Sequence, residues 1–326
     1  MSGTSPLDVV LGTGALGRAV AGELLRRGRR VRLVNRSGRL PEPPPGAQTR
    51  AADLTDPAQT QATCSGADTV YLCANVPYTD WPAKWPPLAA GILEGVARAG
   101  AKLVYGDNLY SYGPVPGPLH EDLPNAATGV KGRVRMGIAT RFLEAHRAGR
   151  VRVAIGRASD FYGPWATDSS LLGSRVIPAA LAGKPGQVIG DVDQPHTFTF
   201  IRDYARGLAT LGAREEALGG VWHVPSAETT TQRALLAMVW HEAGGGAARF
   251  SAAPGWLVRA LGLFSPIMRE LAEMLYEWEQ PYVVDHSKFE RAFGAETTPH
   301  REAIRETVAW FRERAVAPRE LPAAPR

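Results

Sequence analysis

The 326-residue sequence predicts an α/β fold in which a doubly wound parallel β-sheet is followed by a smaller, mostly helical cap. Short apolar runs of strand length alternate with amphipathic runs of helical length through the first half of the chain. A glycine-rich turn joins the first apolar run to the first helical run. After Tyr162 the alternation fades, and most of the remaining segments have helical patterns.

The elements of the first half follow from this alternation. Because apolar strands alternate with helices, we expect a parallel sheet that is covered on both faces. The expected strands are residues 9–12, 31–35, a short run before Asp53, 69–75, 102–106 and 151–159. The expected helices are residues 16–27, 58–64, 88–99 and 131–146.

The second half is expected to form a cap and not an independent domain. The expected helices are 169–185, 201–213 and 229–244, the last of them capped by a threonine. The expected strands are 185–191, 195–201 and 220–226, and the last of these can return to the main sheet; residues 250–315 are mostly helical. The chain then divides into a sheet domain over 1–165, a cap over 166–317 with some segments returning to the sheet domain, and a disordered tail over 318–326.

Charge and cysteine content narrow the class of protein. The net charge is +5, but arginines and glutamates are interspersed along the helical runs, so we expect no nucleic-acid partner. No apolar run reaches the roughly 18 residues of a membrane span, and we expect no membrane partner. Two isolated cysteines, Cys64 and Cys73, and the lack of an export signal favour a cytoplasmic location. No spacing of His, Cys, Asp and Glu indicates a metal site, which leaves a small molecule as the expected partner.

Three glycines form a G-x-G-x-x-G motif directly after the first strand, at the start of a helix. Gly12 permits a tight turn, Gly14 lets backbone N–H groups approach a pyrophosphate, and Gly17 lets the helix pack close to the sheet. The motif therefore predicts a Rossmann-type dinucleotide-binding domain. The alternative is a glycine-rich turn in a fold that has lost its ligand.

The end of the second strand predicts which dinucleotide binds. An acidic residue would accept a hydrogen bond from a free ribose 2′-hydroxyl there, but the chain has Asn35, Arg36 and Ser37 instead. The Arg36 guanidinium can bind a 2′-phosphate through two charge-assisted hydrogen bonds, and Ser37 can add a third. We expect NADP(H) in preference to NAD(H). The alternative is that Arg36 is a solvated turn residue.

Further segments follow in a recognisable order: AADLTDP, YLCANVP, LVYGDNLYSYGP, TGVKGRVRMGIATRFLEAH, RASDFYGP and GVWHVPS. Over residues 7–315 this order resembles the extended short-chain dehydrogenases/reductases, the family of NAD-dependent epimerases and dehydratases. Together with the glycine motif, the resemblance implies a set of cofactor-binding residues. They are Gly12, Thr13, Gly14, Ala15, Leu16, Gly17, Asn35, Arg36, Ser37, Asp53, Leu54, Ala74, Asn75 and Arg135.

The catalytic residues of that family are replaced in this chain. The family has a serine or threonine after the fifth strand and a Tyr-x-x-x-Lys pair at the start of the next helix. Here Asn108 falls on the serine position, Lys131 on the tyrosine position and Arg135 on the lysine position, while Leu11 replaces the family's first glycine. These departures resemble the atypical members of the family. We expect Asn108 to polarise a substrate carbonyl and Lys131 or Tyr110 to supply a proton.

The charges of the segment that opens this helix have two interpretations. Lys131 and Arg135 lie four residues apart and so share one helix face, which the resemblance directs at the nicotinamide ribose. Arg135 is permanently protonated, so it can hold ribose hydroxyls but cannot exchange protons. Arg133 points elsewhere and is expected to be solvated. The alternative is that all three are surface charges.

Aromatic side chains predict the substrate pocket. Tyr78, Trp81 and Trp85 are expected in a loop after the fourth strand, and Phe161 and Trp165 in a loop after the sixth. Ligands of open α/β sheets bind at these strand ends, so the loops indicate an apolar or aromatic substrate. The alternative is that these rings only anchor the loops by packing.

The predicted function is that of an NADP(H)-dependent oxidoreductase that reduces a carbonyl or related unsaturated group of an apolar or aromatic small molecule. A nucleotide-sugar epimerase or dehydratase is the first alternative, although those reactions depend on the missing tyrosine. In that case Arg175, Lys184 and Arg202 fall where the family's cap often holds a phosphate-bearing group. A non-catalytic NADP(H) sensor is the second alternative. Members of the family often dimerise, so a homodimer is an open alternative to a monomer.

Overall fold

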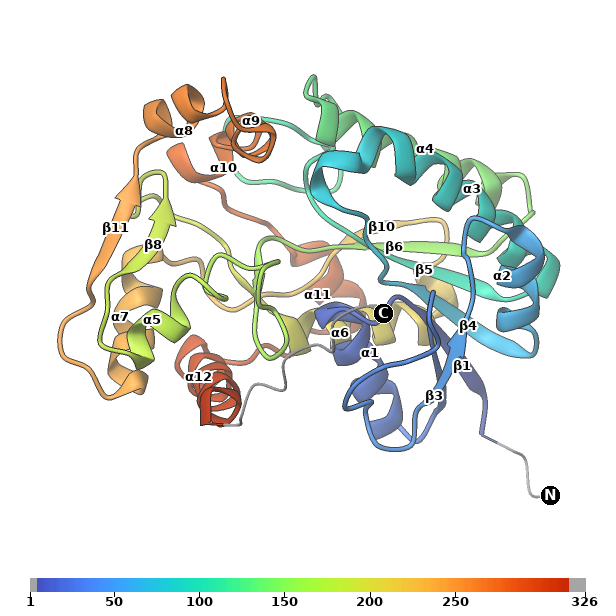
Figure 1. The fold of residues 1–326 in the computed structure, drawn as a ribbon. Coiled ribbons are helices and arrows are strands. Elements are labelled where there is room, and N and C mark those ends of the chain that lie inside the picture. Colours follow the sequence, from blue (N-terminus) through green and yellow to red (C-terminus); the bar gives the residue numbers. More distant parts are fainter. Residues whose placement is uncertain (1–4, 317–326) are drawn as a thin grey trace, which may run out of the picture.

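A seven-stranded parallel sheet forms the centre of the computed structural model, which describes residues 5–316 (Figure 1). The strand order is β10-β6-β5-β4-β1-β2-β3, and every neighbouring pair is parallel. The strands are β1 (Leu7–Leu11), β2 (Arg30–Asn35), β3 (Gln48–Ala51), β4 (Ala67–Leu72), β5 (Lys102–Asp107), β6 (Val153–Arg157) and β10 (Val221–His223).

Helices cover both faces of this sheet, which confirms the predicted α/β fold. Helices α1 (Ala15–Arg26) and α6 (Ile201–Ala213) pack on one face, where their apolar side chains form a core with the strands. Helices α2 (Pro57–Cys64), α3 (Trp81–Ala99) and α4 (Val130–Arg147) enclose a second core on the other face. The strands are therefore buried on both sides, as their continuous apolar runs require.

The second half of the chain builds a cap beside the carboxyl ends of the strands (Figure 1). Its core contains apolar side chains of two short parallel strand pairs and of the cap helices. The strand pairs are β7 (Phe161–Tyr162) with β9 (Thr199–Phe200), and β8 (Gly186–Ile189) with β11 (Phe250–Ala253). The helices are α5 (Ile177–Leu181), α7 (Gln232–Ala243), α8 (Gly255–Leu261), α9 (Pro266–Glu273), α10 (Tyr276–Glu279) and α12 (His300–Val316), while α11 (Ser287–Phe293) packs near β10.

Two predicted elements of the cap agree with the structure. The segment expected to return to the main sheet does so as β10, beside β6. The predicted threonine cap of α7 is Thr231, whose hydroxyl accepts the N–H of Ala234 at 3.1 Å. The predicted tail over 318–326 lies outside the described residues, and the division of the chain near residue 165 stays a prediction.

Two helices differ from the prediction. The helix expected over 169–185 is reduced to α5, because Gly173 turns the chain so closely against the carbonyl of Thr167 that a Cβ would lie 1.7 Å from its oxygen. Helix α3 begins at Trp81, earlier than expected, with Pro82 in its first turn, where a proline costs little. Trp81 and Trp85 lie four residues apart and are both buried, which stabilises this first part of the helix. Within residues 5–316, no helix is long and apolar enough to cross a membrane.

Candidate dinucleotide and substrate site

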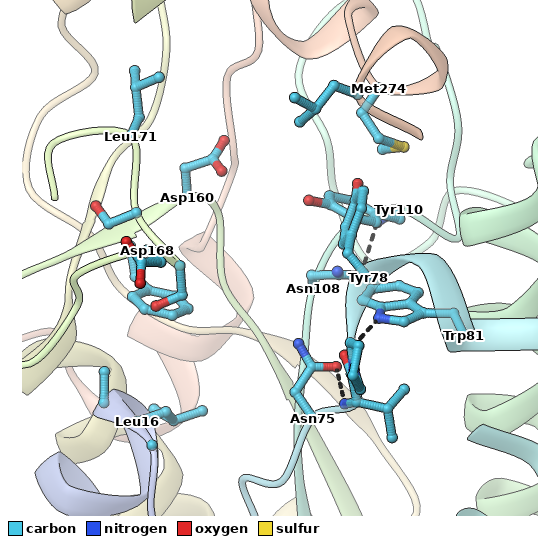
Figure 2. A pocket seen from close by; sticks show the side chains of 18 of the residues that line it. Leu16, Asn75, Tyr78, Trp81, Asn108, Tyr110, Asp160, Asp168, Leu171 and Met274 are labelled. Atoms are coloured by element: carbon cyan, nitrogen blue, oxygen red, sulfur yellow. Dashed lines mark hydrogen bonds between the residues drawn. The ribbon is translucent and has the colours of Figure 1, made fainter. Parts of the chain in front are cut away.

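A cavity of about 1470 Å³ runs from the glycine turn, along the carboxyl ends of the strands, into the cap. Figure 2 shows Leu16 and Asn75 toward one end, Leu171 and Met274 toward the other, and Asn108 between them. Pockets for a single small ligand usually measure about 300–1,000 Å³. The cavity therefore has room for a dinucleotide and a second ligand beside it.

The glycine turn has the shape that phosphate binding needs. Gly12 has a φ of +105°, and a Cβ at this position would lie 2.5 Å from the backbone nitrogen of Ala74. A Cβ on Gly17 would lie 2.0 Å from the carbonyl oxygen of Gly12, so both positions require glycine. Gly14, in contrast, faces open space in the cavity and begins α1 without any side-chain cap. The N–H groups of this first helical turn are therefore available to a phosphate.

Hydrogen bonds of Asn35 hold the loop after β2, which would contact the adenosine ribose. The Asn35 amide donates to the Thr13 hydroxyl at 3.1 Å and to the Arg39 carbonyl at 2.9 Å, so it ties this loop to the glycine turn. Arg36 is exposed and lines the cavity, as does Ser37, whose hydroxyl contacts the Asn35 oxygen at 3.2 Å. No carboxylate lies at the end of β2. This loop can accommodate a phosphate.

The remaining predicted cofactor residues lie along the same cavity, except for Gly17, which lies behind the turn. The Asp53 carboxylate accepts the N–H and the hydroxyl of Thr55, and these hydrogen bonds lower the pKa of Asp53. The Asn75 oxygen accepts the N–H of Val76 at 3.0 Å. The glycine turn, the β2 loop and these side chains together fit a nicotinamide dinucleotide.

Asn108 and Tyr110 project from the chain just after β5 (Figure 2). The Asn108 oxygen accepts the N–H of Tyr110 at 3.3 Å, which orients the amide. The Tyr110 ring stacks on Trp81 with centroids 6.0 Å apart. Burial raises the pKa of the Tyr110 hydroxyl well above its ordinary value, so this group is protonated at neutral pH. It can donate a proton more readily than it can accept one.

Lys131 and Arg135 are both buried, whereas Arg133 is exposed. The interpretation of Lys131 and Arg135 as surface charges is therefore wrong. The Lys131 ammonium contacts the carboxylate of Glu270 in α9 and the carbonyl of Tyr78, and it does not line the cavity. This placement disagrees with the expectation that Lys131 supplies a proton to the substrate, because its ammonium is fully buried against Glu270 and Tyr78 and does not line the cavity.

Arg135 does line the cavity. Its guanidinium contacts the Tyr105 hydroxyl, lies 3.6 Å from the Asp107 carboxylate, and stacks over the ring of Trp81 at 4.3 Å. Asp107 also accepts a hydrogen bond from buried Arg157 at 3.1 Å. The buried Nε of Arg135 has no partner among residues 5–316. Arg135 therefore lines the cavity and keeps one buried donor without a partner among these residues; its role toward a ribose stays a prediction.

The predicted aromatic residues divide into two groups. Tyr78, Trp81 and Phe161 line the cavity. Trp85 does not, because it belongs to α3 and packs under Arg135, 4.7 Å away. Trp165 also lies elsewhere: it packs against Trp310 with centroids 5.1 Å apart. For Trp85 and Trp165 the packing interpretation is correct.

Three acidic residues that the sequence analysis overlooked lie in or beside this site. Asp107 ends β5, and Asp160 follows β6. Glu277 lies on α10 with 2% exposure, and its Oε1 has no partner among the described residues. Burial, and then the charge of Asp160, raise the pKa of Glu277 well above its ordinary value, which favours the neutral carboxyl. Asp160 could have been predicted as a site residue because it follows a strand of the sheet. Nothing in the sequence around Glu277 identifies it as one.

Two buried histidines beside the site, His196 and His223, have structural partners. The His196 ring contacts Asp160 and the carbonyl of Glu277, each at 3.0 Å. The His223 ring contacts the Tyr112 hydroxyl and the carbonyl of Asp285, each at 2.9 Å, and burial lowers its pKa to about 3. Within residues 5–316, no cluster of His, Cys, Asp and Glu could hold a metal ion.

Of the three cap cations considered in the sequence, only Arg175 lines the cavity. Arg202 instead forms an ion pair with Glu306 at 2.6 Å, and Lys184 lies away from the cavity wall. The rest of the cap end combines apolar side chains with hydroxyl and amide groups and with the carboxyl groups of Asp160, Asp168 and Glu277. The hydroxyl and amide groups belong to Thr167, Ser169, Ser170, Ser174, Gln187, Ser251 and Tyr282. A single guanidinium is thus available there to an anionic substrate group.

A parallel sheet with a glycine turn and a cavity at the strand ends defines the Rossmann-type class of α/β folds. The model of the NAD dependent epimerase/dehydratase family matches residues 9–224, well over half of the chain, and the chain belongs to this family. No curated protein matches the sequence.

Solved structures agree with this fold. UDP-glucuronic acid 4-epimerase from Bacillus cereus, in complex with NAD, is 18% identical with a TM-score of 0.74, covering 94% of this chain and 97% of its own. A putative epimerase from Burkholderia cenocepacia is 20% identical with a TM-score of 0.77, covering 95% and 99%. The dTDP-glucose 4,6-dehydratase from Bacillus anthracis, also in complex with NAD, is 14% identical with a TM-score of 0.77, covering 95% and 97%. At these identities the likeness shows the fold alone.

Proposed function

We propose that the chain is an NAD(P)-dependent enzyme that transfers a hydride between its cofactor and an oxygen-bearing carbon of a small molecule. The observation that carries this proposal is one continuous cavity, which joins the glycine turn to Asn108, Tyr110 and Arg135 and then enters the cap. When bound, the dinucleotide supplies the hydride donor or acceptor at its nicotinamide ring. The N–H groups after Gly14 would hold the pyrophosphate, and Arg135 the nicotinamide ribose.

The preferred cofactor in this proposal is NADP(H). Arg36 lines the cavity at the end of β2, has no carboxylate partner within 4 Å among residues 5–316, and can reach a 2′-phosphate from there. The epimerase and dehydratase structures named above contain NAD. They support a nicotinamide dinucleotide and by themselves point to NAD, so the preference for NADP(H) depends on Arg36 alone.

Three side chains of the protein would orient the substrate and deliver a proton to it. The Asn108 amide can donate to a substrate oxygen and so polarise its bond to carbon. The Tyr110 hydroxyl, which is protonated at neutral pH, can deliver a proton to that oxygen as it gains charge. Arg135 keeps its charge throughout and serves only to position.

The comparisons favour a nucleotide-sugar epimerase or dehydratase as the first candidate. Family membership supports it, and two solved structures of the same fold are named for such enzymes. Arg175 could bind the substrate's diphosphate at the cap end of the cavity.

The site itself favours a second candidate, the reduction of a carbonyl on an apolar small molecule. The walls of the cap end are built mainly from side chains such as Leu171, Val188 and Met274. Asp160 would repel a diphosphate. Epimerisation also begins with an oxidation that needs a base, and the Tyr110 hydroxyl, which is protonated at neutral pH, is not available as one.

Two substrate panels distinguish these candidates. The purified protein is given NADPH or NADH with varied carbonyl compounds, or NAD⁺ with UDP- and dTDP-linked sugars, and cofactor absorbance and products are followed. In whichever panel turns over, Tyr110→Phe should lower kcat by about 10²–10⁴-fold with little change in cofactor affinity. The control Tyr112→Phe alters a tyrosine outside the cavity and should retain kcat. Cofactor binding without turnover in either panel would instead support the sensor alternative.

A further inference from the structure

The large exposed hydrophobic side chains of residues 5–316 gather on one segment of the cap. Trp256, Leu263 and Phe264 are 69%, 74% and 87% exposed, and Leu261 and Ile267 are 46% and 41% exposed. All five lie in α8, in α9 or in the turn between them, which we call the α8–α9 hairpin (residues 255–273). Scattered exposed side chains are ordinary, but a gathered patch marks an interaction surface.

The sixth large exposed hydrophobic residue lies near the C-terminal end of α9. It is Val130, at the start of α4, and its neighbour Gly129 lies directly against Glu273 of α9. Figure 1 shows α8 and α9 at the outer edge of the cap, away from β1–β3 of the main sheet. The patch therefore lies on an edge that projects from the molecule. It is not a partly exposed margin of the hydrophobic core.

The charged residues near the patch differ between its outer and inner sides. Residues 260–268 contain no charged side chain, and arginines stand on either side of them at positions 259 and 269. Arg269 is exposed and has no carboxylate within ion-pair distance among residues 5–316. The acidic residues of α9 turn inward instead, because Glu270 and Glu273 both contact Lys131 of α4. Arg259 is neutralised by an ion pair with Glu279, so the outer side of the hairpin is apolar, with Arg269 as the basic group at its border.

The apolar surface continues from the tip of the hairpin into the cavity. Leu257 and Val258 line the cavity from α8, and Met268 lines it from α9. Leu261 and Ile267 are exposed at the surface and also line the cavity. An apolar molecule could therefore pass from the hairpin tip to the cavity along apolar side chains.

We propose that the α8–α9 hairpin docks on an anionic lipid surface. Trp256, Leu263 and Phe264 would enter the boundary between headgroups and acyl chains, and Arg269 would contact lipid phosphates. A second copy of the chain fits the patch less well, because a stable protein interface needs about 20–30 residues a side. The proposal goes beyond the proposed function and does not depend on it.

This inference revises the sequence-based expectation that the protein has no membrane partner. That expectation was based on the lack of an apolar run long enough to span a bilayer. A hairpin that lies in the interface needs no such run, because only its tip leaves the water.

Vesicle co-sedimentation of the full chain tests the proposal. The probes are vesicles of phosphatidylcholine alone and of phosphatidylcholine with phosphatidylglycerol. We expect the protein to bind the mixed vesicles, and Leu263→Ser/Phe264→Ser to weaken this binding more than about tenfold. Arg269→Glu should weaken binding to the mixed vesicles only. Its matched control, Arg214→Glu, makes the same charge change at an exposed position after α6 and should weaken binding less.

Unchanged melting temperature and cofactor affinity show that the double variant is folded; if it does not fold, Phe264→Ser alone takes its place. The proposal is overturned if the unaltered protein stays in solution with both kinds of vesicle, or if the hairpin variant binds them equally well. It is also overturned if sedimentation equilibrium shows a dimer that the hairpin variant converts to a monomer. A second copy of the chain would then be the partner of this surface.

Discussion

Arg36 is the single residue on which the choice of cofactor depends. We expect Arg36→Ala to weaken NADPH binding about 10- to 100-fold, because charge-assisted hydrogen bonds contribute about 1.5–3 kcal/mol. NADH affinity should change little, since NADH has no phosphate for the guanidinium to meet. Calorimetric titration of both cofactors measures this, with Arg39→Ala as the control at an exposed neighbour. Equal affinities for NADPH and NADH in the unaltered protein would remove the NADP(H) preference.

Glu277 predicts a pH dependence of stability. The pKa of its carboxyl is raised in the folded state, so the unfolded chain releases this proton at a lower pH than the folded chain does. The carboxyl therefore lowers the free energy of unfolding progressively as pH rises from its ordinary pKa toward the raised one. Glu277→Gln removes this pH-dependent decrease in the free energy of unfolding. Thermal melting should show a larger gain in melting temperature for the variant at pH 8 than at pH 4.5.

Glu279 provides a control of opposite sign on the same helix. Its hydrogen bonds with Arg259 lower the pKa of its carboxyl, so it stabilises the fold above its ordinary pKa. Glu279→Gln should therefore lower the melting temperature more at pH 8 than at pH 4.5. If the Glu277→Gln and Glu279→Gln differences had the same pH dependence, the burial of a neutral Glu277 carboxyl would be refuted.

Single residues were predictable where a local motif specifies them. Gly12 and Gly14 could be found because a turn and a helix start need them at fixed spacing, and Arg135 by its position in the helix. Glu277 could not be found, because its environment comes from segments far apart in the sequence: it lies beside the ring of His196 and near Asp160. The local sequence around a buried carboxyl in a helical segment with charged neighbours looks the same as the local sequence around an exposed carboxyl.

Among the contacts between helices, Lys131 joins α9 to α4 in two ways. The Lys131 ammonium pairs with Glu270, and the Lys131 N–H at the start of α4 donates to Glu273 at 2.7 Å. Gly129 gives α4 no side-chain cap of its own, so Glu273 of α9 supplies the carboxylate that a helix N-terminus favours. Helix α9 is thereby held over the cavity.

Lys131→Met tests this attachment. Loss of the ion pair should lower the free energy of unfolding by about 1.5–3 kcal/mol and speed hydrogen exchange in α9, where Glu270 loses its partner. Arg133→Met, which removes an exposed cation from the same helical turn, should leave exchange in α9 unchanged. Unchanged exchange in the Lys131 variant would show that this ion pair does not hold α9.

Elements were predicted well in the sheet and less well around prolines. Helix α3 was expected over 88–99, and Pro82, Pro86 and Pro87 lie in the segment before Leu88, where prolines disfavour helix. In the structure, buried Trp81 and Trp85 hold that segment in helical form, a tertiary contribution that local propensity does not contain.

For the whole molecule, the parallel direction of the strands was predicted from the alternation of strands and helices, and the edge of the sheet at which the cavity lies from the rule that ligands bind at the carboxyl ends of the strands. The strand order was not predicted. The extent of the cavity was not predicted either, because the cap segments that close it are short and irregular. Their placement depends on packing around rings such as Trp240 and Trp278. The substrate class is for this reason the least predictable part of the account, and the cofactor site the most predictable.

The central claim is that the cavity binds a nicotinamide dinucleotide across the Gly14 turn. Calorimetric titration of NADPH and NADH into the unaltered protein, Gly14→Val and Gly22→Val tests it most directly. Gly22 is an exposed glycine of the same helix, also with open space at its Cβ, so its variant makes the same substitution away from the cavity. We predict that the unaltered protein and Gly22→Val bind cofactor, while folded Gly14→Val binds it more than about tenfold more weakly. Equal binding by folded Gly14→Val, or no binding by the unaltered protein, would contradict the account.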